Sequence, residues 1–204
     1  MNPTQEMIKR LFLSIAISVA ALIAGTSSVA AAVTRCDGPL SGTHDTVLVP
    51  EGKNCEVVDT VIVQGNVILQ EGASLTIDCN VFTVNGNLLG DGVNSVIIKG
   101  EGDLVSIHGN VSITGATGEV QLDFVTIGGN LNISDSNGTK FISVAQSQVA
   151  GNALFQNNTT DKFSITANRI TGNLVCNGNN DAPLLGTGPN ANTVGGQRIG
   201  QCSQ

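Results

Sequence analysis

Alternating apolar and polar residues recur along the chain in short segments that share one pattern. In each unit, the pattern apolar-x-apolar lies on both sides of a Gly-Asn pair, as in residues 61–69 and 105–113. Alternation with a period of two predicts two short strands, and the glycine between them permits a backbone corner. A third alternating segment, such as residues 75–77 or 96–98, completes each unit. The pattern therefore predicts a repeated coil of three strands.

The Gly-Asn pairs recur at intervals of 20 to 23 residues, and a degenerate pair follows after 24. They are Gly65-Asn66, Gly86-Asn87, Gly109-Asn110, Gly129-Asn130, Gly151-Asn152 and Gly172-Asn173, with Gly196-Gln197 as the degenerate pair. Self-similarity at such a period indicates a solenoid. Left-handed hexapeptide solenoids keep a strict period of about 18 residues, so the longer, irregular period favours the right-handed form. We predict an all-β fold, a single-stranded right-handed parallel β-helix of about seven coils of 20–24 residues.

Stacking of these coils places one asparagine of each unit at the same corner. The expected Asn ladder consists of Asn66, Asn87, Asn110, Asn130, Asn152 and Asn173. Each side-chain amide can donate a hydrogen bond to one neighbouring coil and accept one from the other. The asparagine column therefore has a structural explanation, and we assign it no catalytic or ligand-binding role.

The cysteines indicate how the two ends of the solenoid are closed. Open ends would template aggregation unless they are capped. Cys36 and Cys55 flank the first coil-like segment, whereas Cys176 and Cys202 bracket a tail rich in glycine and asparagine. We predict a Cys36 to Cys55 bridge and a Cys176 to Cys202 bridge, one at each end. The odd count leaves Cys79 as a buried or half-buried free thiol.

The N-terminus has the features of an export signal. Lys9 and Arg10 precede an apolar stretch over residues 11–25, and small residues follow as far as Ala32. We expect cleavage after Ala32, with a cut after Ala30 as an alternative. A retained membrane helix is a further alternative, although the stretch is shorter than the roughly 20 residues that a span needs. Arg35, directly before the first cysteine, argues against a lipid anchor.

The expected organisation is a signal peptide over residues 1–32 and a β-helix domain over residues 33–204. Within the domain, residues 33–59 form the N-terminal cap and first coil, residues 60–176 the regular coils, and residues 177–204 the C-terminal coil and cap. The sequence therefore predicts a secreted protein, extracellular or periplasmic, with no membrane span after cleavage. Disulfides persist in such compartments.

Composition narrows the classes of partner. Residues 33–204 carry 15 acidic and 7 basic side chains, and such a negative surface repels nucleic acid and anionic lipid. The chain has no Trp or Tyr and only six Phe. A core of Val, Ile and Leu suits stacked short strands, and the lack of Trp and Tyr removes the usual platforms for stacking on sugars.

The export signal, the repeated Val-x-Gly-Asn units and the ending from Cys176 to Cys202 resemble a group of small secreted microbial β-helix proteins. The resemblance covers nearly the whole domain. It implies the fold and supports the terminal bridge, but it brings no settled activity. The coil also resembles pectin lyase-like proteins, many of which act on polysaccharides.

Catalytic groups of the kind used by polysaccharide-active β-helices are not evident in the sequence. Such enzymes need acidic clusters together with a basic residue or a histidine, and the chain has no Asp-Asp pair, Gly-His-Gly or Arg-x-Lys motif. We interpret His108 as a solvent-facing turn residue stacked on Gln64 and Asn85. His44 lies in the N-terminal cap and is assigned no role.

Two acidic rows are expected because stacking brings their members together. Glu51, Glu71 and Asp91 each precede a glycine and form the first row; Asp59, Asn80, Asp103 and Asp123 form the second. Repulsion between like charges one strand apart costs roughly 1 kcal/mol or less in water, which solvated turns can tolerate. Weak Ca²⁺ binding through the oxygen ligands is the alternative. No other cofactor is expected.

The outward residues suggest contact with a partner. One outward column contains Ile68, Leu89, Ser112, Asn132, Leu154 and Val175, and it is a contact surface or is covered by a loop or the C-terminal tail. The leading hypothesis is a non-enzymatic extracellular structural or surface-interaction protein that contacts matrix, cell envelope or glycan. The alternative is a carbohydrate-binding or polysaccharide-active β-helix. The oligomeric state is left open.

Overall fold

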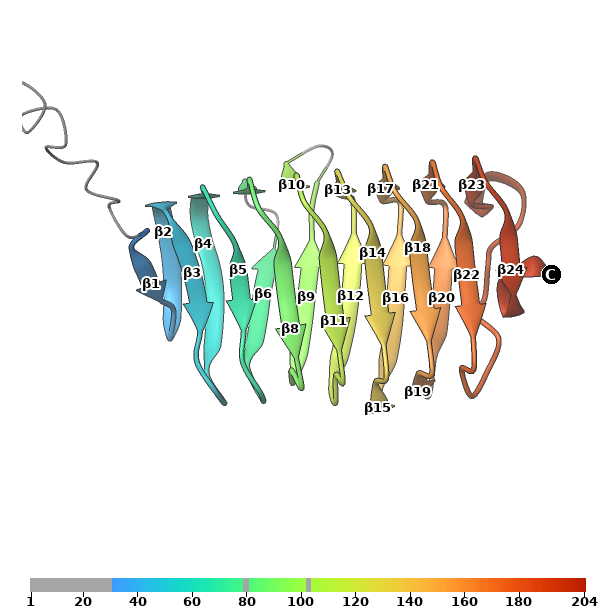
Figure 1. Ribbon diagram of the computed structural model, residues 1–204, viewed down its shortest axis with the longest axis horizontal. Coiled ribbons are helices and arrows are strands. Elements are labelled where there is room, and N and C mark those ends of the chain that lie inside the picture. The colour runs from blue at the N-terminus through green and yellow to red at the C-terminus, as the bar shows by residue number, and fades with distance from the viewer. Residues whose placement is uncertain (1–30, 79–80, 102–103) are drawn as a thin grey trace, which may run out of the picture. The chain divides into compact units, whose positions relative to one another are not determined.

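The computed structural model of the protein describes residues 31–78, 81–101 and 104–204. These residues fold as an all-β solenoid of about eight turns, with parallel pairing between successive coils (Figure 1). The predicted fold class is confirmed, but the estimate of about seven coils was too low. Residues 33–44 form a coil ahead of the first Gly-Asn pair, and counting those pairs therefore missed it.

One side of the solenoid is a nine-stranded parallel sheet, which we call face A. In Figure 1 its strands run downward while the strands of the opposite side run upward behind them, and the chain advances from left to right as a right-handed coil. Face A consists of β1 (Val33–Arg35), β3 (Thr46–Val49), β5 (Val67–Leu69), β8 (Leu88–Asp91), β11 (Val111–Thr114), β14 (Leu131–Ser134), β18 (Ala153–Gln156), β22 (Leu174–Asn177) and β24 (Arg198–Gly200).

The other strands form face B, face C and one short corner pair. Face B contains β6 (Ser74–Asp78), β9 (Ser95–Lys99), β12 (Glu119–Asp123), β16 (Phe141–Ala145) and β20 (Phe163–Thr166). Face C contains β7 (Phe82–Val84), β10 (Val105–Ile107), β13 (Val125–Ile127), β17 (Gln148–Val149), β21 (Arg169–Ile170) and β23 (Thr193–Val194). The long strands β2 (Gly38–His44) and β4 (Asn54–Val63) contribute to both faces. The corner pair is β15 (Asn137–Thr139) with β19 (Thr159–Thr160).

The core is a set of inward columns of aliphatic side chains. On face A, Val67, Leu88, Val111 and Leu131 follow one another in register, and each is at most 1% exposed. The alternation in sequence produces this arrangement because successive side chains of a strand point to opposite faces. Burial of each such side chain contributes about 1.5–3 kcal/mol relative to the exposed state. The solenoid is therefore held together along its whole length by apolar contacts between adjacent coils.

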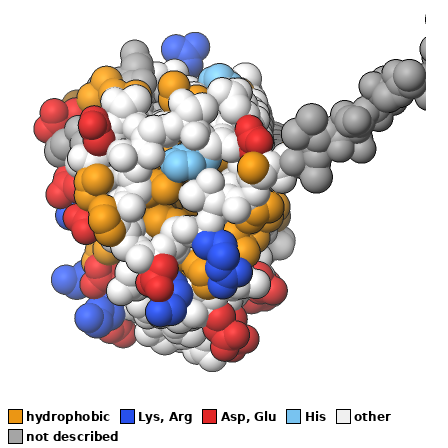
Figure 2. Space-filling model, turned by 90° about the vertical axis from the view of Figure 1, so that its left-hand side faces the viewer, with side chains coloured by type: hydrophobic (Ala, Val, Ile, Leu, Met, Phe, Trp, Pro, Cys, Tyr) orange, Lys and Arg blue, Asp and Glu red, His pale blue; other side chains and the backbone are white. Residues whose placement is uncertain are grey.

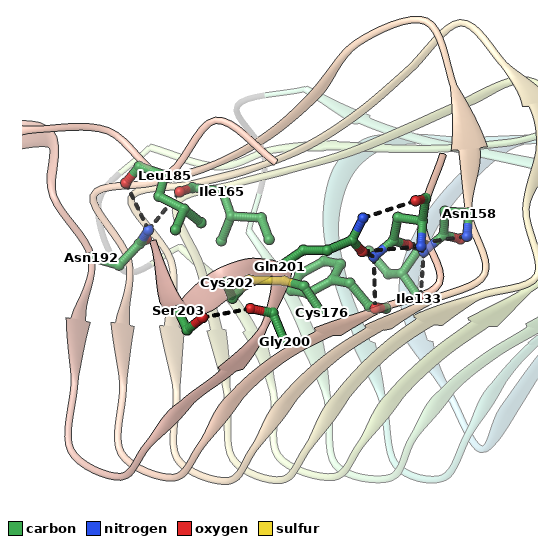
Figure 3. The surroundings of a disulfide bond; sticks show 12 residues. Ile133, Asn158, Ile165, Cys176, Leu185, Asn192, Gly200, Gln201, Cys202 and Ser203 are labelled. Atoms are coloured by element: carbon green, nitrogen blue, oxygen red, sulfur yellow. Dashed lines mark hydrogen bonds between the residues drawn. A yellow bond between two sulfur atoms is a disulfide. The ribbon is translucent and has the colours of Figure 1, made fainter. Parts of the chain in front are cut away.

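Both ends of the solenoid are closed by disulfide bridges, as predicted. Cys36 is bonded to Cys55, with 5.4 Å between their Cα atoms, and Cys176 to Cys202, with 5.2 Å. Figure 3 shows how the short 3₁₀ helix η2 (Gln201–Ser203) places the Cys202 side chain against the end of the core. A second 3₁₀ helix, η1 (Gly188–Asn190), lies in the preceding loop. Cys79, predicted as a free thiol, lies outside the described residues.

Candidate functional site

The Gly-Asn corners form the predicted Asn ladder on the outer edge between faces C and A. The Oδ1 atom of Asn87 accepts hydrogen bonds from the backbone N–H and the Nδ2 atom of Asn110, at 2.8 and 3.1 Å. The same double contact joins each consecutive pair from Asn66 to Asn152. Asn173 and Gln197 extend the ladder through their backbone N–H groups. These hydrogen bonds between coils give the asparagines a structural role.

Two further polar ladders lie inside the solenoid and were missed by the sequence analysis. At the corner between faces A and B, Asn158 Nδ2 donates to Asn179 Oδ1 at 3.0 Å, and Asn179 Nδ2 donates to Gln201 Oε1 at 2.9 Å. At the corner between faces B and C, Asn168 Nδ2 donates to Asn192 Oδ1 at 3.0 Å. All four of these asparagines are at most 6% exposed.

The inner ladders also satisfy backbone carbonyl groups at the bends. Asn158 Nδ2 donates to the Ile133 carbonyl at 3.0 Å, and Asn168 Nδ2 donates to the Val144 carbonyl at 2.8 Å. Figure 3 shows Gln201 closing the first of these ladders beside the disulfide. Gln201 Nε2 also donates to the Asn179 carbonyl at 2.9 Å. The C-terminal cap thus completes both the apolar core and a buried polar column.

The first predicted acidic row is wrong at its third member. The pairing of Val49 with Leu69 places Glu51 opposite Glu71, as expected. The next coil is one residue longer, because Val67 pairs with Leu88, and Asp91 therefore lies opposite Gln70. Gly92 lies against Glu71 instead, and a Cβ atom on it would be 3.2 Å from Glu71 Cγ. The row contains two carboxylates rather than three.

The second predicted acidic row is wrong for Asp123. The corner between faces B and C shortens in this coil to the single residue Phe124, so Asp123 belongs to face B. There it lies opposite Lys99, and Lys99 lies opposite Asp78. Asp59 is an exposed corner residue whose Oδ1 accepts the Thr60 backbone N–H at 2.7 Å. Asn80 and Asp103 lie outside the described residues.

Asp123 has the most unusual environment of the acidic side chains that the structure describes. Gln121 Nε2 donates a hydrogen bond to its Oδ2 atom, whereas its Oδ1 atom is shielded from solvent without a partner among the described residues. Partial burial raises the pKa of Asp123 above the ordinary value of 3.8, against the opposing effects of Gln121 and the positive charge of Lys99. The row of Asp78, Lys99 and Asp123 alternates in charge, which favours a stabilising rather than a metal-binding arrangement.

The two histidines lie on different parts of the molecule. His108 is exposed beside a Gly-Asn corner, as predicted, and in the same column Asn85 Nδ2 donates to Gln64 Oε1 at 2.8 Å. His44 joins two strands of the first coil, since its Nδ1 atom lies 3.1 Å from Thr34 Oγ1 and its Nε2 atom 3.1 Å from the Ser41 carbonyl oxygen. Neither histidine therefore stands out as a catalytic base.

Face A carries a long outward column of mostly apolar side chains. The register aligns one outward residue from each strand from β3 to β24. We call this column the apolar stripe; it consists of Leu48, Ile68, Leu89, Ser112, Asn132, Leu154, Val175 and Ile199. Ile68, Leu89 and Ile199 are 36–37% exposed, and the others are half-buried between neighbouring strands. The eight residues of the stripe are uncharged, but Arg35 of β1 lies opposite Leu48 and continues the same column at its N-terminal end.

Faces B and C present more polar outward columns. The central column of face B begins with Pro39 and continues through Glu56 and Thr76 to Gln121 and Ser143. The central column of face C runs from Ile62 and Thr83 to Gln148 and Arg169. Each contains a charged side chain, as the column of the apolar stripe does at Arg35, but neither contains a run of three apolar residues in successive coils. Face A is therefore the surface best suited to contact with another macromolecule.

Comparison with known proteins found no family model, curated protein or solved structure that matches the chain. The resemblance to pectin lyase-like proteins thus stays an expectation. Among the described residues, no group of three or more His, Cys, Asp or Glu side chains is arranged to hold a metal ion. The same part of the chain contains no helix long and apolar enough to cross a membrane.

Proposed function

We propose that the protein is a non-enzymatic, extracellular structural or surface-interaction solenoid. The observation that carries this proposal is face A, a row of parallel strands whose outward apolar stripe is uncharged and partly exposed. Apolar side chains that are aligned on one face and partly exposed are typical of contact sites for other macromolecules. The matrix, the cell envelope or another protein surface are the classes of partner that this proposal covers.

Several features support a scaffold role for the solenoid itself. The polar residues at the corners are engaged in ladders between coils, and each end is clamped by a disulfide. Interactions of this kind hold every coil against its neighbours, which suits a stiff rod that presents surfaces at fixed spacing. The two bridges are compatible with an oxidising compartment, and the export signal that we infer over residues 1–32 would deliver the chain there.

The experiment compares where variants of the exported chain are found in a culture. Leu89→Lys places a charge in the apolar stripe, and Ile62→Lys places the same charge in the equivalent column of face C as a control. We expect the unaltered protein and the control to fractionate with high-molecular-mass extracellular or envelope material, and Leu89→Lys to be released. Identical fractionation of all three proteins would overturn the role of face A.

A second measurement separates this function from carbohydrate processing. The purified protein is incubated with pectin and alginate, and unsaturated products and new reducing ends are measured. We expect neither to form above the level of the buffer control. Formation of either product at a rate proportional to protein concentration would replace the proposal with a polysaccharide-active enzyme.

A further inference from the structure

The order of residues in the apolar stripe is nearly the same in both directions along the solenoid. Three apolar residues, Leu48, Ile68 and Leu89, precede the central pair Ser112 and Asn132. Three more apolar residues follow the central pair, namely Leu154, Val175 and Ile199. The two central residues contact each other, with Asn132 Nδ2 donating to Ser112 Oγ at 3.4 Å. The stripe is therefore self-complementary about a point between β11 and β14.

We propose that face A is the interface of an antiparallel homodimer, with a two-fold axis that runs parallel to the strands between β11 and β14. This inference rests on the proposed function, since it names a second copy of the chain as the partner at face A. In an isologous interface, a residue that contacts a second position is itself contacted by that position in the other subunit. Leu89 then meets Leu154, Ile68 meets Val175, and Ser112 meets Asn132.

The distribution of charge selects the antiparallel arrangement. Residues 31–129 contain twelve acidic and three basic side chains, whereas residues 130–204 contain three acidic and four basic ones. Figure 2 shows acidic side chains around the rim at the N-terminal end of the solenoid. A parallel dimer would also match the stripe with itself, but it would place the two acidic halves side by side. The antiparallel dimer places each acidic half beside a nearly neutral one, which lowers the repulsion.

The size of face A sets the expected strength of the dimer. The axis pairs the eight strands from β3 to β24, which at about 4.8 Å apart span about 34 Å, and four residues of about 3.3 Å each give a width of about 13 Å. The flat area is therefore about 440 Å² on each copy, at the lower end for specific interfaces. Two flat sheets can approach to about 10 Å with their side chains interleaved. We expect a reversible dimer whose population rises with concentration.

End-to-end stacking is the competing way for two copies to meet, since β1 and β24 are the edge strands of face A. At the C-terminal end, η2 folds against the last coil, and its Cys202 side chain is completely buried there. This cap lies where the next copy would have to continue the inward columns. The apolar stripe is left accessible by both caps, so the lateral arrangement uses the surface that is exposed.

The first experiment is sedimentation equilibrium of the protein obtained from the full chain, over a wide concentration range. The expected result is a monomer–dimer equilibrium whose dissociation constant is raised at least about tenfold by Leu89→Lys, because two charges are then buried against apolar side chains. The control Ile62→Lys should dimerise like the unaltered protein. A monomer at all concentrations, or a mass that keeps growing as in a filament, would overturn the proposal.

The second experiment tests the direction of the two copies. Leu154→Glu alone should weaken the dimer, and combining it with Leu89→Lys in one chain should restore it, because each introduced lysine then faces an introduced glutamate. A parallel dimer would instead place like charges together and stay dissociated. Circular dichroism confirms that each variant is folded, and Ile68→Lys with Val175→Glu is the second pair if either variant is unfolded. Failure of the folded double variants to dimerise would overturn the antiparallel arrangement, whereas release of polysaccharide products would instead overturn the proposed function.

Discussion

Asn130 donates two hydrogen bonds to the side chain of Asn110, one from its backbone N–H at 2.8 Å and one from Nδ2 at 3.1 Å, both to Oδ1. This contact lies in the middle of the outer Asn ladder, where coils are present on both sides. The interaction explains why asparagine recurs after the corner glycine. A side chain with only an acceptor atom would satisfy the backbone N–H of the next coil, but a side-chain amide can also donate a hydrogen bond to the preceding coil.

Replacement of Asn110 by alanine should therefore destabilise the solenoid. The change removes one acceptor of two hydrogen bonds and one donor to Asn87, and we expect the free energy of unfolding to fall by about 1–3 kcal/mol. Asn85→Ala serves as the control, since it removes only one hydrogen bond, to Gln64, and should cost less than about 1 kcal/mol. Urea unfolding measures both variants. An equal loss of unfolding free energy in both variants would show that the Asn ladder stabilises the solenoid no more than a single surface hydrogen bond does.

The corner glycines should tolerate no side chain because adjacent coils approach closely there. A Cβ atom at Gly109 would lie 2.5 Å from the Gly86 carbonyl oxygen and 2.6 Å from Asn87 Oδ1. We expect Gly109→Ala to lower the free energy of unfolding by about 1–3 kcal/mol or more.

The matched control for this change is Gly138→Ala, at a glycine with a φ of 75° and no other heavy atom within 4 Å of the added Cβ. This variant meets only backbone strain, of about 1–2 kcal/mol. Thermal unfolding of the two variants compares the cost of a steric clash between coils, at Gly109, with the cost of backbone strain alone, at Gly138. A larger loss at Gly138 than at Gly109 would contradict the close stacking of the corners.

The sequence predicted the parts of the structure that repeat strictly. Inward residues such as Val67 and Leu88 alternate with outward ones, and the Gly-Asn pairs mark one corner of most coils. The other two corners vary in length and residue type, so stacked partners could not be assigned from intervals alone. Asp91 and Asp123 were misplaced for this reason. The inner ladder of Asn158 and Asn179 was missed because the same corner holds Ala73, Val93 and Ala116 in earlier coils.

A weak sequence signal for the inner ladders is nevertheless present. Asp135, Asn157 and Gly178 have positive φ values of 55°, 53° and 66°, and each directly precedes a buried polar residue. Asn, Asp and Gly are the residues that most readily adopt this left-handed conformation. A residue of this type followed by Ser or Asn at the coil period therefore indicates a bend with an inward polar side chain.

The bridge between Cys176 and Cys202 should stabilise the C-terminal cap in particular. The two cysteines are 26 residues apart, and closing a loop of this length is worth about 3.5 kcal/mol in the chain-entropy model. We expect the Cys176→Ser/Cys202→Ser double variant to exchange backbone hydrogens faster in β24 and η2 than in β11. Hydrogen–deuterium exchange with mass spectrometry measures the difference. A uniform increase along the solenoid would indicate that the bridge does not act locally.

Calcium should have little effect on the stability of the solenoid. Glu51 and Glu71 are the only aligned pair of the first predicted row, and Asp123 lies beside Lys99, whereas Ca²⁺ takes six to eight oxygen ligands. We expect the same melting temperature in millimolar calcium and in EDTA. If calcium raised the melting temperature and Glu71→Gln abolished that increase, the predicted calcium site at the first row would be restored.

Asp123 should make the solenoid less stable as the pH rises. Its pKa is raised in the folded state above 3.8, chiefly by burial, so the folded protein binds this proton more tightly than the unfolded chain does. Stability linked to Asp123 is therefore lost as the pH rises from the ordinary pKa through the raised one, and the loss is complete above it. We expect Asp123→Asn, which keeps an acceptor for Gln121, to raise the melting temperature at pH 7 but to change it less at pH 3. Differential scanning calorimetry at the two pH values provides the test, and a stabilisation equal at both would rule out titration of this carboxyl group as the cause.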